Sequence, residues 1–264
     1  MSSDKVYRSE LTPVDFLRRS ARVYPNKTAI VYGERRYTYA QFSERVCRLA
    51  SGLQNAGFTL GDRIAILSPN TPALLEAHFA IPALGGILVP VNIRLQPDEV
   101  AYILADSGAR FLFIDEAFYP QIAELDLAQL QLIHITDTGQ ADDPYEQFLA
   151  AASPDPLLRV IDDEETPLSM NYTSGTTGQP KGVLCTHRGA YLNAMGQIVE
   201  IGLDRDSVFL WTLPMFHCNG WCCTWAITAI GGTHVCLRSI EPDAVWALLE
   251  DERITHYNCA PTIQ

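Results

Sequence analysis

Basic residues are scarce in this chain, and lysine is the scarcest of them. The 264 residues include 19 Lys and Arg against 31 Asp and Glu, which gives a formal charge of −12. Only three positions are lysine: Lys5, Lys27 and Lys181. A duplex-binding protein needs a basic face, and an anionic membrane surface repels an acidic protein, so both functions are disfavoured. We therefore expect no nucleic-acid partner and give weight to the surroundings of each lysine.

The chain also lacks a long apolar run and any paired cysteine spacing. The longest apolar stretch, residues 79–91, contains two prolines and is too short to cross a bilayer. The first ten residues are polar and lack the apolar segment of a signal peptide. None of the seven cysteines forms a Cys-x-x-Cys pair. An odd number of cysteines without a secretory signal indicates reduced thiols, so we expect no transmembrane segment and a cytoplasmic location.

Helical and strand patterns alternate along the chain. Apolar periodicity predicts helices over residues 40–56, 71–84, 97–106, 187–200, 220–230 and 242–251. Short apolar runs predict strands over residues 63–67, 87–91, 110–114, 132–136, 167–172, 183–185, 207–213, 233–237 and 254–259. These runs are continuous rather than alternating, which is typical of parallel strands covered on both faces. The sequence therefore predicts an α/β fold with mostly parallel, helix-covered sheets.

Residues 153–167 interrupt this alternation. The stretch contains three prolines and four consecutive acidic residues, Asp162 to Glu165. Such composition is typical of a solvated linker. A metal site is the weaker interpretation, because adjacent carboxylates on an extended chain point in different directions. We therefore expect one α/β subdomain over residues 1–160 and a second over residues 161–264.

The most informative segment is Tyr172–Gly182, which reads Tyr-Thr-Ser-Gly-Thr-Thr-Gly-Gln-Pro-Lys-Gly and joins two predicted strands. Glycines let backbone N–H groups approach a ligand, hydroxyls donate to phosphate oxygens, and lysine supplies a compact positive charge. This set describes a loop that wraps a polyphosphate, and it is too ordered for a plain polar turn. A Walker A loop fits badly because Pro180 and Gly182 flank Lys181. A dinucleotide fingerprint fails because Thr177 stands where a glycine is needed.

A second segment, Leu213–Trp221, combines a histidine, aromatic residues and a glycine between a predicted strand and a predicted helix. In open α/β sheets, ligands bind outside the carboxyl ends of strands, where this segment falls. From the residues alone, core packing is the commoner role for such side chains. A zinc site at the neighbouring cysteines lacks the usual paired spacing. A hydrolase pair of Cys218 and His217 is disfavoured because nucleophile and base normally meet through the fold.

Residues 172–182 resemble the phosphate-binding signature of the adenylate-forming superfamily, which includes acyl-CoA synthetases, luciferases and peptide-synthetase adenylation domains. Other stretches along the whole chain resemble the same family in the same order: Thr28–Ile30, Arg36–Tyr39, Gly61–Ala65, Val89–Asn92 and Ala260–Thr262. Residues 213–221 are most similar to the fatty-acyl and aryl-acid CoA ligases. The resemblance implies the large N-terminal α/β domain of such enzymes, ending before their small C-terminal domain.

The resemblance also implies a two-step reaction. ATP activates a carboxylic acid to an acyl-adenylate, and coenzyme A then displaces AMP to form a thioester. The resemblance, carried over residue by residue, assigns the binding of the ATP phosphates to Thr173, Ser174, Gly175, Thr176, Thr177, Gly178 and Lys181. In these roles Lys181 stabilises phosphate charge, and Thr173 is the hydroxyl on the side of the Mg²⁺ ion that a transferring phosphate requires. The acid and its adenylate lie beside His217, Gly220 leaves room for the acyl group, and Trp221 lines its tail with Cys222 and Trp225.

Three functions follow as hypotheses. The leading one is an ATP-dependent CoA ligase for a medium-chain fatty acid or an aryl acid. The others are an adenylation enzyme that loads a carrier protein and a nucleotide- or acyl-binding module without turnover. The family's later Mg²⁺ and ribose motifs and its C-terminal catalytic lysine do not occur within the 264 residues. We therefore expect the isolated chain to complete neither half-reaction and to bind nucleotide weakly.

Overall fold

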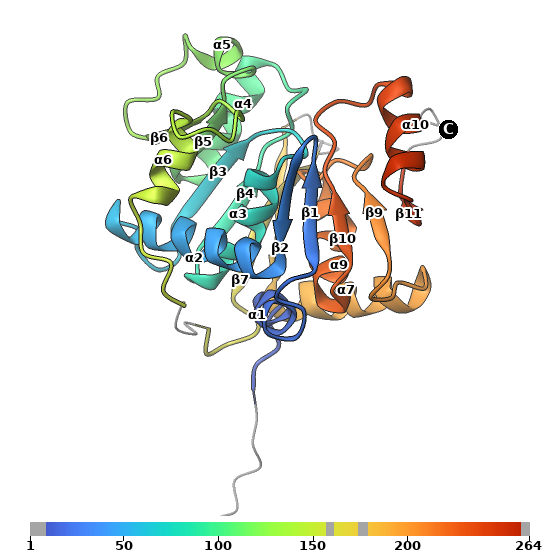
Figure 1. Ribbon diagram of the computed structural model, residues 1–264. Coiled ribbons are helices and arrows are strands. Elements are labelled where there is room, and N and C mark those ends of the chain that lie inside the picture. Colours follow the sequence, from blue (N-terminus) through green and yellow to red (C-terminus); the bar gives the residue numbers. More distant parts are fainter. Residues whose placement is uncertain (1–8, 157–160, 174–178, 260–264) are drawn as a thin grey trace, which may run out of the picture.

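The computed structural model describes residues 9–156, 161–173 and 179–259, and the fold is that of these residues (Figure 1). The helices are α1 (Val14–Val23), α2 (Tyr39–Asn55), α3 (Pro72–Ala83), α4 (Pro97–Ser107), α5 (Tyr119–Ile122), α6 (Pro144–Ala150), α7 (His187–Glu200), α8 (Cys218–Trp221), α9 (Cys223–Ile230) and α10 (Pro242–Asp251). The strands are β1 (Thr28–Tyr32), β2 (Arg35–Thr38), β3 (Arg63–Leu67), β4 (Ile87–Pro90), β5 (Ala109–Asp115), β6 (Gln131–Ile135), β7 (Pro167–Thr173), β8 (Lys181–Thr186), β9 (Val208–Leu210), β10 (Thr233–Val235) and β11 (His256–Tyr257).

The strands form two sheets that lie beside each other, with α10 and β11 at one end of the molecule and β6 at the other (Figure 1). Sheet A has the order β11-β9-β10-β1-β2, and sheet B has the order β6-β5-β3-β4-β7-β8. Neighbouring strands are parallel except in the hairpins β1–β2 and β7–β8. The predicted α/β class with mostly parallel sheets is confirmed.

Each sheet draws strands from both sides of the acidic segment at residues 153–167. The hairpin β1–β2 precedes this segment but pairs with β10 through Ile30 and Val31. The hairpin β7–β8 follows it but extends sheet B beside β4. Strands therefore do not pair in chain order; they pair where their apolar side chains become buried. The subdomain boundary expected near residue 160 is therefore not a boundary between the sheets.

The largest core lies between the two sheets. It combines residues of sheet A, such as Ile30 and Phe209, with residues of sheet B, such as Ile64 and Phe111, and with the apolar faces of α2, α3 and α9. Every residue of α3 is buried, as expected of a helix whose residues are apolar except for Glu76 and His78. A second core lies between the other face of sheet B and α4. Both faces of sheet B are thus covered, which explains its continuous apolar strands.

Local sequence signals set the ends of several helices. Thr38 and Gln41 form a reciprocal capping box at the start of α2, and Thr186 accepts a hydrogen bond from the Gly189 amide at the start of α7. The predicted ranges 187–200 and 242–251 match α7 and α10 residue for residue. No helix in the described part of the chain is both long and apolar enough to cross a membrane.

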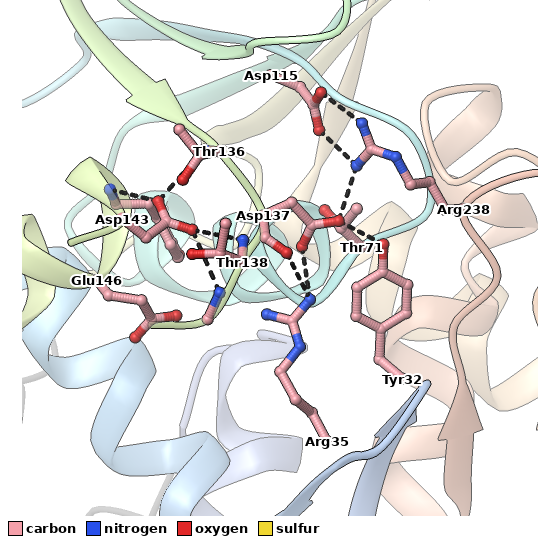
Figure 2. A network of polar contacts seen from close by, with 12 residues as sticks. Tyr32, Arg35, Thr71, Asp115, Thr136, Asp137, Thr138, Asp143, Glu146 and Arg238 are labelled. Atoms are coloured by element: carbon pink, nitrogen blue, oxygen red, sulfur yellow. Dashed lines mark hydrogen bonds and ion pairs between the residues drawn. The ribbon is translucent and has the colours of Figure 1, made fainter. Parts of the chain in front are cut away.

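A network of charged side chains joins the two sheets at the carboxyl ends of their strands (Figure 2). Arg238, which follows β10, donates to Asp115 at the end of β5 at 2.6 and 2.8 Å and to Asp137 at 2.7 Å. Arg35 also donates to Asp137 at 2.8 Å, and the Tyr32 hydroxyl donates to the same carboxylate. Asp115 is almost completely buried. Burial of this carboxylate requires a close cationic partner, so Arg238 fixes sheet A against sheet B.

Candidate functional site

The site lies where the carboxyl ends of strands from both sheets meet. In sheet B the chain passes from β3 to β4 on one side and then to β5 on the other, and sheet A changes direction in the same way around β9. Ligands of open α/β sheets bind in the crevice at such switch points. Asn70 follows β3, Asn92 follows β4, Thr173 ends β7, and residues 211–217 follow β9.

The phosphate-loop motif forms the tip of the β7–β8 hairpin. Thr173 pairs with Lys181 and Tyr172 with Gly182 in an antiparallel register, as expected from the strand patterns on both sides of the motif. Thr173 and Lys181 are both exposed. The predicted phosphate-binding residues Ser174, Gly175, Thr176, Thr177 and Gly178 lie outside the described residues. The structure therefore describes the stem that carries the loop, and the roles of the loop residues stay predictions.

Two adjoining hollows, with volumes of about 1050 and 270 Å³, share part of their lining, and the smaller one opens beside this hairpin. Asn92, Phe216 and His217 line both. The smaller hollow is bounded by Thr173 and Pro180, on either side of the phosphate loop. The larger one has an apolar wall from α10: Val245, Trp246 and Leu249. His217 thus lies between a hollow that reaches the phosphate-loop stem and a larger one with an apolar wall from α10.

The chain after His217 makes a left-handed turn rather than the helix predicted from Gly220. Residues 218–222 all have φ between 49° and 62°, and the right-handed helix α9 begins only at Cys223. Each non-glycine residue in this conformation costs about 1–2 kcal/mol, so tertiary contacts must hold the turn. Strain of this kind concentrates at functional sites, which favours a site role for the segment over simple core packing. The left-handed turn could not be predicted from the sequence, because residues 220–230 have helical periodicity.

Gly220 is buried in this turn against an indole ring. A Cβ atom at Gly220 would lie 2.4 Å from Trp211, and φ is +59°. The Trp211 ring is itself fixed, because its plane lies within 5° of the His234 ring plane and its Nε1 donates to His234 Nδ1 at 3.1 Å. Burial lowers the pKa of His234 to about 3, so the imidazole is neutral and can accept this bond. Gly220 therefore has a packing reason in addition to its predicted acyl-pocket role, which stays a prediction.

Replacing Gly220 with alanine is expected to destabilise the fold strongly. The matched control is Gly202→Ala, because Gly202 has φ of +66° and open space around its Cβ position. Gly202→Ala measures the left-handed strain alone, about 1–2 kcal/mol. Gly220→Ala adds the clash with Trp211, and we expect it to cost about 2 kcal/mol more, the scale of an overpacked core. Urea unfolding of both variants measures the difference, and equal losses would contradict this packing.

The other predicted residues of the acyl pocket separate into exposed and buried groups. Trp221 is 56% exposed, whereas Trp225 is fully buried and donates to the His78 carbonyl at 3.1 Å. Cys222 is also buried. Trp225 is thus a core residue, in agreement with core packing, the alternative role that we gave for the side chains of this segment. Cys218 is exposed, and its Sγ lies 3.9 Å from His217 Nε2, so the two neighbours in sequence are also in contact.

Three asparagines that our sequence interpretation did not assign to the site hold the segment in place. The Asn70 amide donates to the carbonyls of Trp211 and Leu213 at 2.9 and 3.0 Å and accepts from the Met215 amide at 2.8 Å. Asn171 and Asn219 connect the same segment to β7. The signal that could have identified Asn70 and Asn92 is a polar amide shortly after a buried strand run, at the edge where parallel strands end.

The formal charges around the hollows are mixed. Arg94 lines the larger hollow, and Glu99 lies at the smaller one. Magnesium bound through phosphates needs only one or two protein oxygens, and the exposed Thr173 hydroxyl can be one of them. The described residues contain no cluster of three or more His, Cys, Asp or Glu side chains arranged to hold a metal. The residues present therefore fit a magnesium ion that arrives with a nucleotide better than an ion held by the protein alone.

Comparison with known proteins identifies the family of the chain. The model of the family described as AMP-binding enzyme matches residues 17–264. The probable acyl-activating enzyme 12, peroxisomal, of Arabidopsis thaliana is 41% identical over 96% of this chain and 47% of its own length. The 4-hydroxybutyrate–CoA ligase 2 of Metallosphaera sedula is 41% identical over 97% of this chain and 48% of its own length. The chain thus spans about half the length of these curated relatives.

Solved structures give the same result. The N-terminal domain of FACL13 from Mycobacterium tuberculosis, in an inhibitor-bound crystal structure, superposes with a TM-score of 0.87 at 29% identity, covering 96% of this chain and 64% of that one. The anthranilate CoA ligase AuaEII in complex with anthranoyl-AMP has a TM-score of 0.88 at 26% identity, covering 97% of this chain and 51% of that one. The chain belongs to the AMP-binding enzyme family and has the fold of the N-terminal domain of acyl-CoA synthetases.

Proposed function

We propose that the protein containing this chain activates a carboxylic acid with ATP and transfers the acyl group to coenzyme A. The observation that carries the proposal is the placement of His217 between two hollows, one beside the phosphate-loop stem and one with an apolar wall. A polyphosphate on the loop and an apolar acid in the larger hollow would then meet beside His217. Relatives named butyrate–CoA ligase and benzoate–CoA ligase support this class of reaction.

In the first step, a carboxylate oxygen attacks the α-phosphorus of ATP. The bond from that phosphorus to the bridging oxygen of pyrophosphate breaks, which gives an acyl-adenylate. Lys181 is the first residue of β8 and pairs with Thr173 at the phosphate-loop end of the hairpin. At this position its ammonium can neutralise charge on the departing pyrophosphate. Magnesium, when bound, supplies further neutralisation of the phosphates. His217 contacts the carboxylate and its adenylate, and Arg94 adds positive charge to the larger hollow.

In the second step, the thiol of coenzyme A attacks the adenylate carbonyl, its proton is lost, and AMP leaves. The larger hollow, about 1050 Å³, is large enough for a medium-chain or aryl acid. Relatives whose names give benzoate and trans-cinnamate support an aryl acid, and one whose name gives butyrate supports a short aliphatic acid. A cytoplasmic location stays a prediction, since several of these relatives are named as peroxisomal proteins.

The deciding experiment is acid-dependent exchange of radiolabelled pyrophosphate into ATP by the protein that the complete reading frame encodes. A panel of acetate, butyrate, octanoate, benzoate and cinnamate spans short-chain, medium-chain and aryl acids. We expect exchange with at least one acid and thioester formation once coenzyme A is added. Exchange followed by transfer only to a carrier-protein arm would favour the carrier-loading alternative. Nucleotide binding without exchange for any acid would favour a binding module and contradict the proposal.

A cysteine-dependent hydrolase is the second candidate, because Cys218 and His217 are in contact at the same site. Alkylation with iodoacetamide separates it from the ligase. A hydrolase that uses the Cys218 thiolate as nucleophile loses all activity on alkylation. The ligase chemistry needs no protein thiol, so we expect pyrophosphate exchange to continue after alkylation.

A further inference from the structure

The His217 segment is connected to the phosphate-loop strand by side-chain amides. Asn219, at the second position of the left-handed turn, donates from Nδ2 to Ser169 Oγ at 2.8 Å and to Asn171 Oδ1 at 3.0 Å. Asn171 in turn donates from Nδ2 to the Phe216 carbonyl at 3.3 Å. Ser169 and Asn171 both belong to β7, and Asn171 lies two residues before Thr173. The contacts therefore connect both sides of His217 to the strand that leads into the phosphate loop.

This connection is buried and directional. Ser169, Asn171 and Asn219 are each at most 8% exposed. Because the Asn171 Nδ2 group faces the Phe216 carbonyl, its Oδ1 must face Asn219 and accept from it. The orientation of both amides is thereby fixed. A buried, directional amide pair restricts the relative position of two segments more tightly than apolar contacts do.

Adenylation requires such a restriction. The attacking carboxylate beside His217 and the α-phosphate on the loop must approach within about 3–3.5 Å in the correct direction. The two groups are carried by different sheets, since residues 211–217 follow β9 and the phosphate loop follows β7. Without a cross-connection, relative movement of the sheets would change the distance between the reacting atoms.

We propose, building on the adenylation function, that Asn219 and Asn171 are positioning residues that hold the acid-binding segment in register with the phosphate loop. Neither side chain lines either hollow. They act through the backbone on either side of His217. This role predicts a loss in the rate of the chemical step with little change in the binding of either substrate.

The variant Asn219→Gly tests the role directly, because glycine accepts the left-handed backbone and removes only the amide. In pyrophosphate exchange by the protein from the complete reading frame, we expect kcat to fall about 10- to 100-fold. The KM values for ATP and the acid should change less than about threefold. The matched control is Arg253→Gly, because Arg253 also has a left-handed backbone, with φ of 52°, but lies outside the site. We expect this variant to leave the kinetics unchanged.

The pairing of the two amides is tested by a double-mutant cycle. If Asn171 and Asn219 act as one connection, Asn171→Ala combined with Asn219→Gly is no slower than the slower single variant. Multiplied losses would contradict the pair. A loss of folded protein alone would appear as a lower active-site titre with normal kcat per site, and it would overturn the positioning role.

A readout independent of turnover uses the exposed thiol of Cys218, next to His217. In the wild type, MgATP bound at the loop should change the alkylation rate of Cys218 by iodoacetamide at least threefold, as measured by peptide mass spectrometry. In Asn219→Gly the ratio should approach one. The same ratio in both proteins would indicate direct shielding. No change in the wild type would mean that MgATP binding does not affect the His217 segment through these hydrogen bonds. Either result overturns the inference. The alkylation test can be read even if no acid supports pyrophosphate exchange. A lack of exchange would count against the proposed function alone.

Discussion

Replacing Lys181 with alanine is expected to slow acid-dependent pyrophosphate exchange by at least about 100-fold. The chain has only three lysines, and of the two that the structure describes, Lys27 and Lys181, it is Lys181 that lies at the phosphate-loop stem, opposite Thr173 in the β7–β8 register. Its charge is needed most when negative charge develops on the departing pyrophosphate. Removing one preorganised group that stabilises developing charge costs roughly 10²- to 10³-fold in kcat. Lys181 is exposed at the surface of β8, so the loss should not come from unfolding.

Lys181→Arg is the matched variant, because it keeps the charge but replaces a compact ammonium with a planar fork. We expect intermediate activity from it. Lys27→Ala controls for the loss of one positive charge elsewhere: Lys27 donates to the Gly231 carbonyl and lies outside the site. Its effect should be on thermal stability rather than on kcat per folded molecule. Acyl-adenylate formation at an unchanged rate by Lys181→Ala would refute the phosphate role.

Much of the fold could be predicted from local patterns in the sequence. The helices at residues 187–200 and 242–251 begin at recognisable signals, a Thr186 cap and a proline in the first turn. The β7–β8 hairpin follows from two apolar runs on either side of the phosphate motif. The exposed Thr173 and Lys181 on its stem also lie where the motif suggests. These features depend on residues close together in the chain, which is the information that periodicity contains.

Features that depend on distant residues could not be predicted in this way. The pairing of β1 with β10 joins residues some 200 positions apart. In the left-handed turn at residues 218–222, Asn219 is hydrogen-bonded to Ser169 of β7, and Gly220 leaves no room for a Cβ atom beside Trp211. The backbone preference of non-glycine residues opposes a left-handed turn, so their sequence predicts the start of a right-handed helix instead. The amides of Asn70 and Asn171 belong to the site only through this long-range geometry.

Arg238→Ala is expected to lower the free energy of unfolding by about 3 kcal/mol. Arg238 makes two hydrogen bonds to Asp115, at the end of β5 in the other sheet, and one to Asp137, just after β6 of that sheet (Figure 2). Breaking a buried ion pair by removing one partner costs about 3–5 kcal/mol, because the remaining charge is left uncompensated. Arg238 is 36% exposed, so water can partly replace it and the lower end of this range applies. Arg35 and Tyr32 still contact Asp137, so the greater loss falls on Asp115.

Arg36→Ala is the matched control, since it removes the same side chain from an ion pair with Glu252 at the surface. Exposed pairs contribute about 0–1 kcal/mol, so its effect should be several times smaller. Urea titrations followed by tryptophan fluorescence measure both variants under identical conditions. A large loss for Arg238→Ala with little loss for Arg36→Ala identifies the Asp115 charge as the cause. Similar small losses in both would mean that apolar packing between the sheets, rather than the polar network, holds sheet A against sheet B. Because the site is built from the ends of strands in both sheets, that outcome would also make the core helices α3 and α9 the elements that set its geometry.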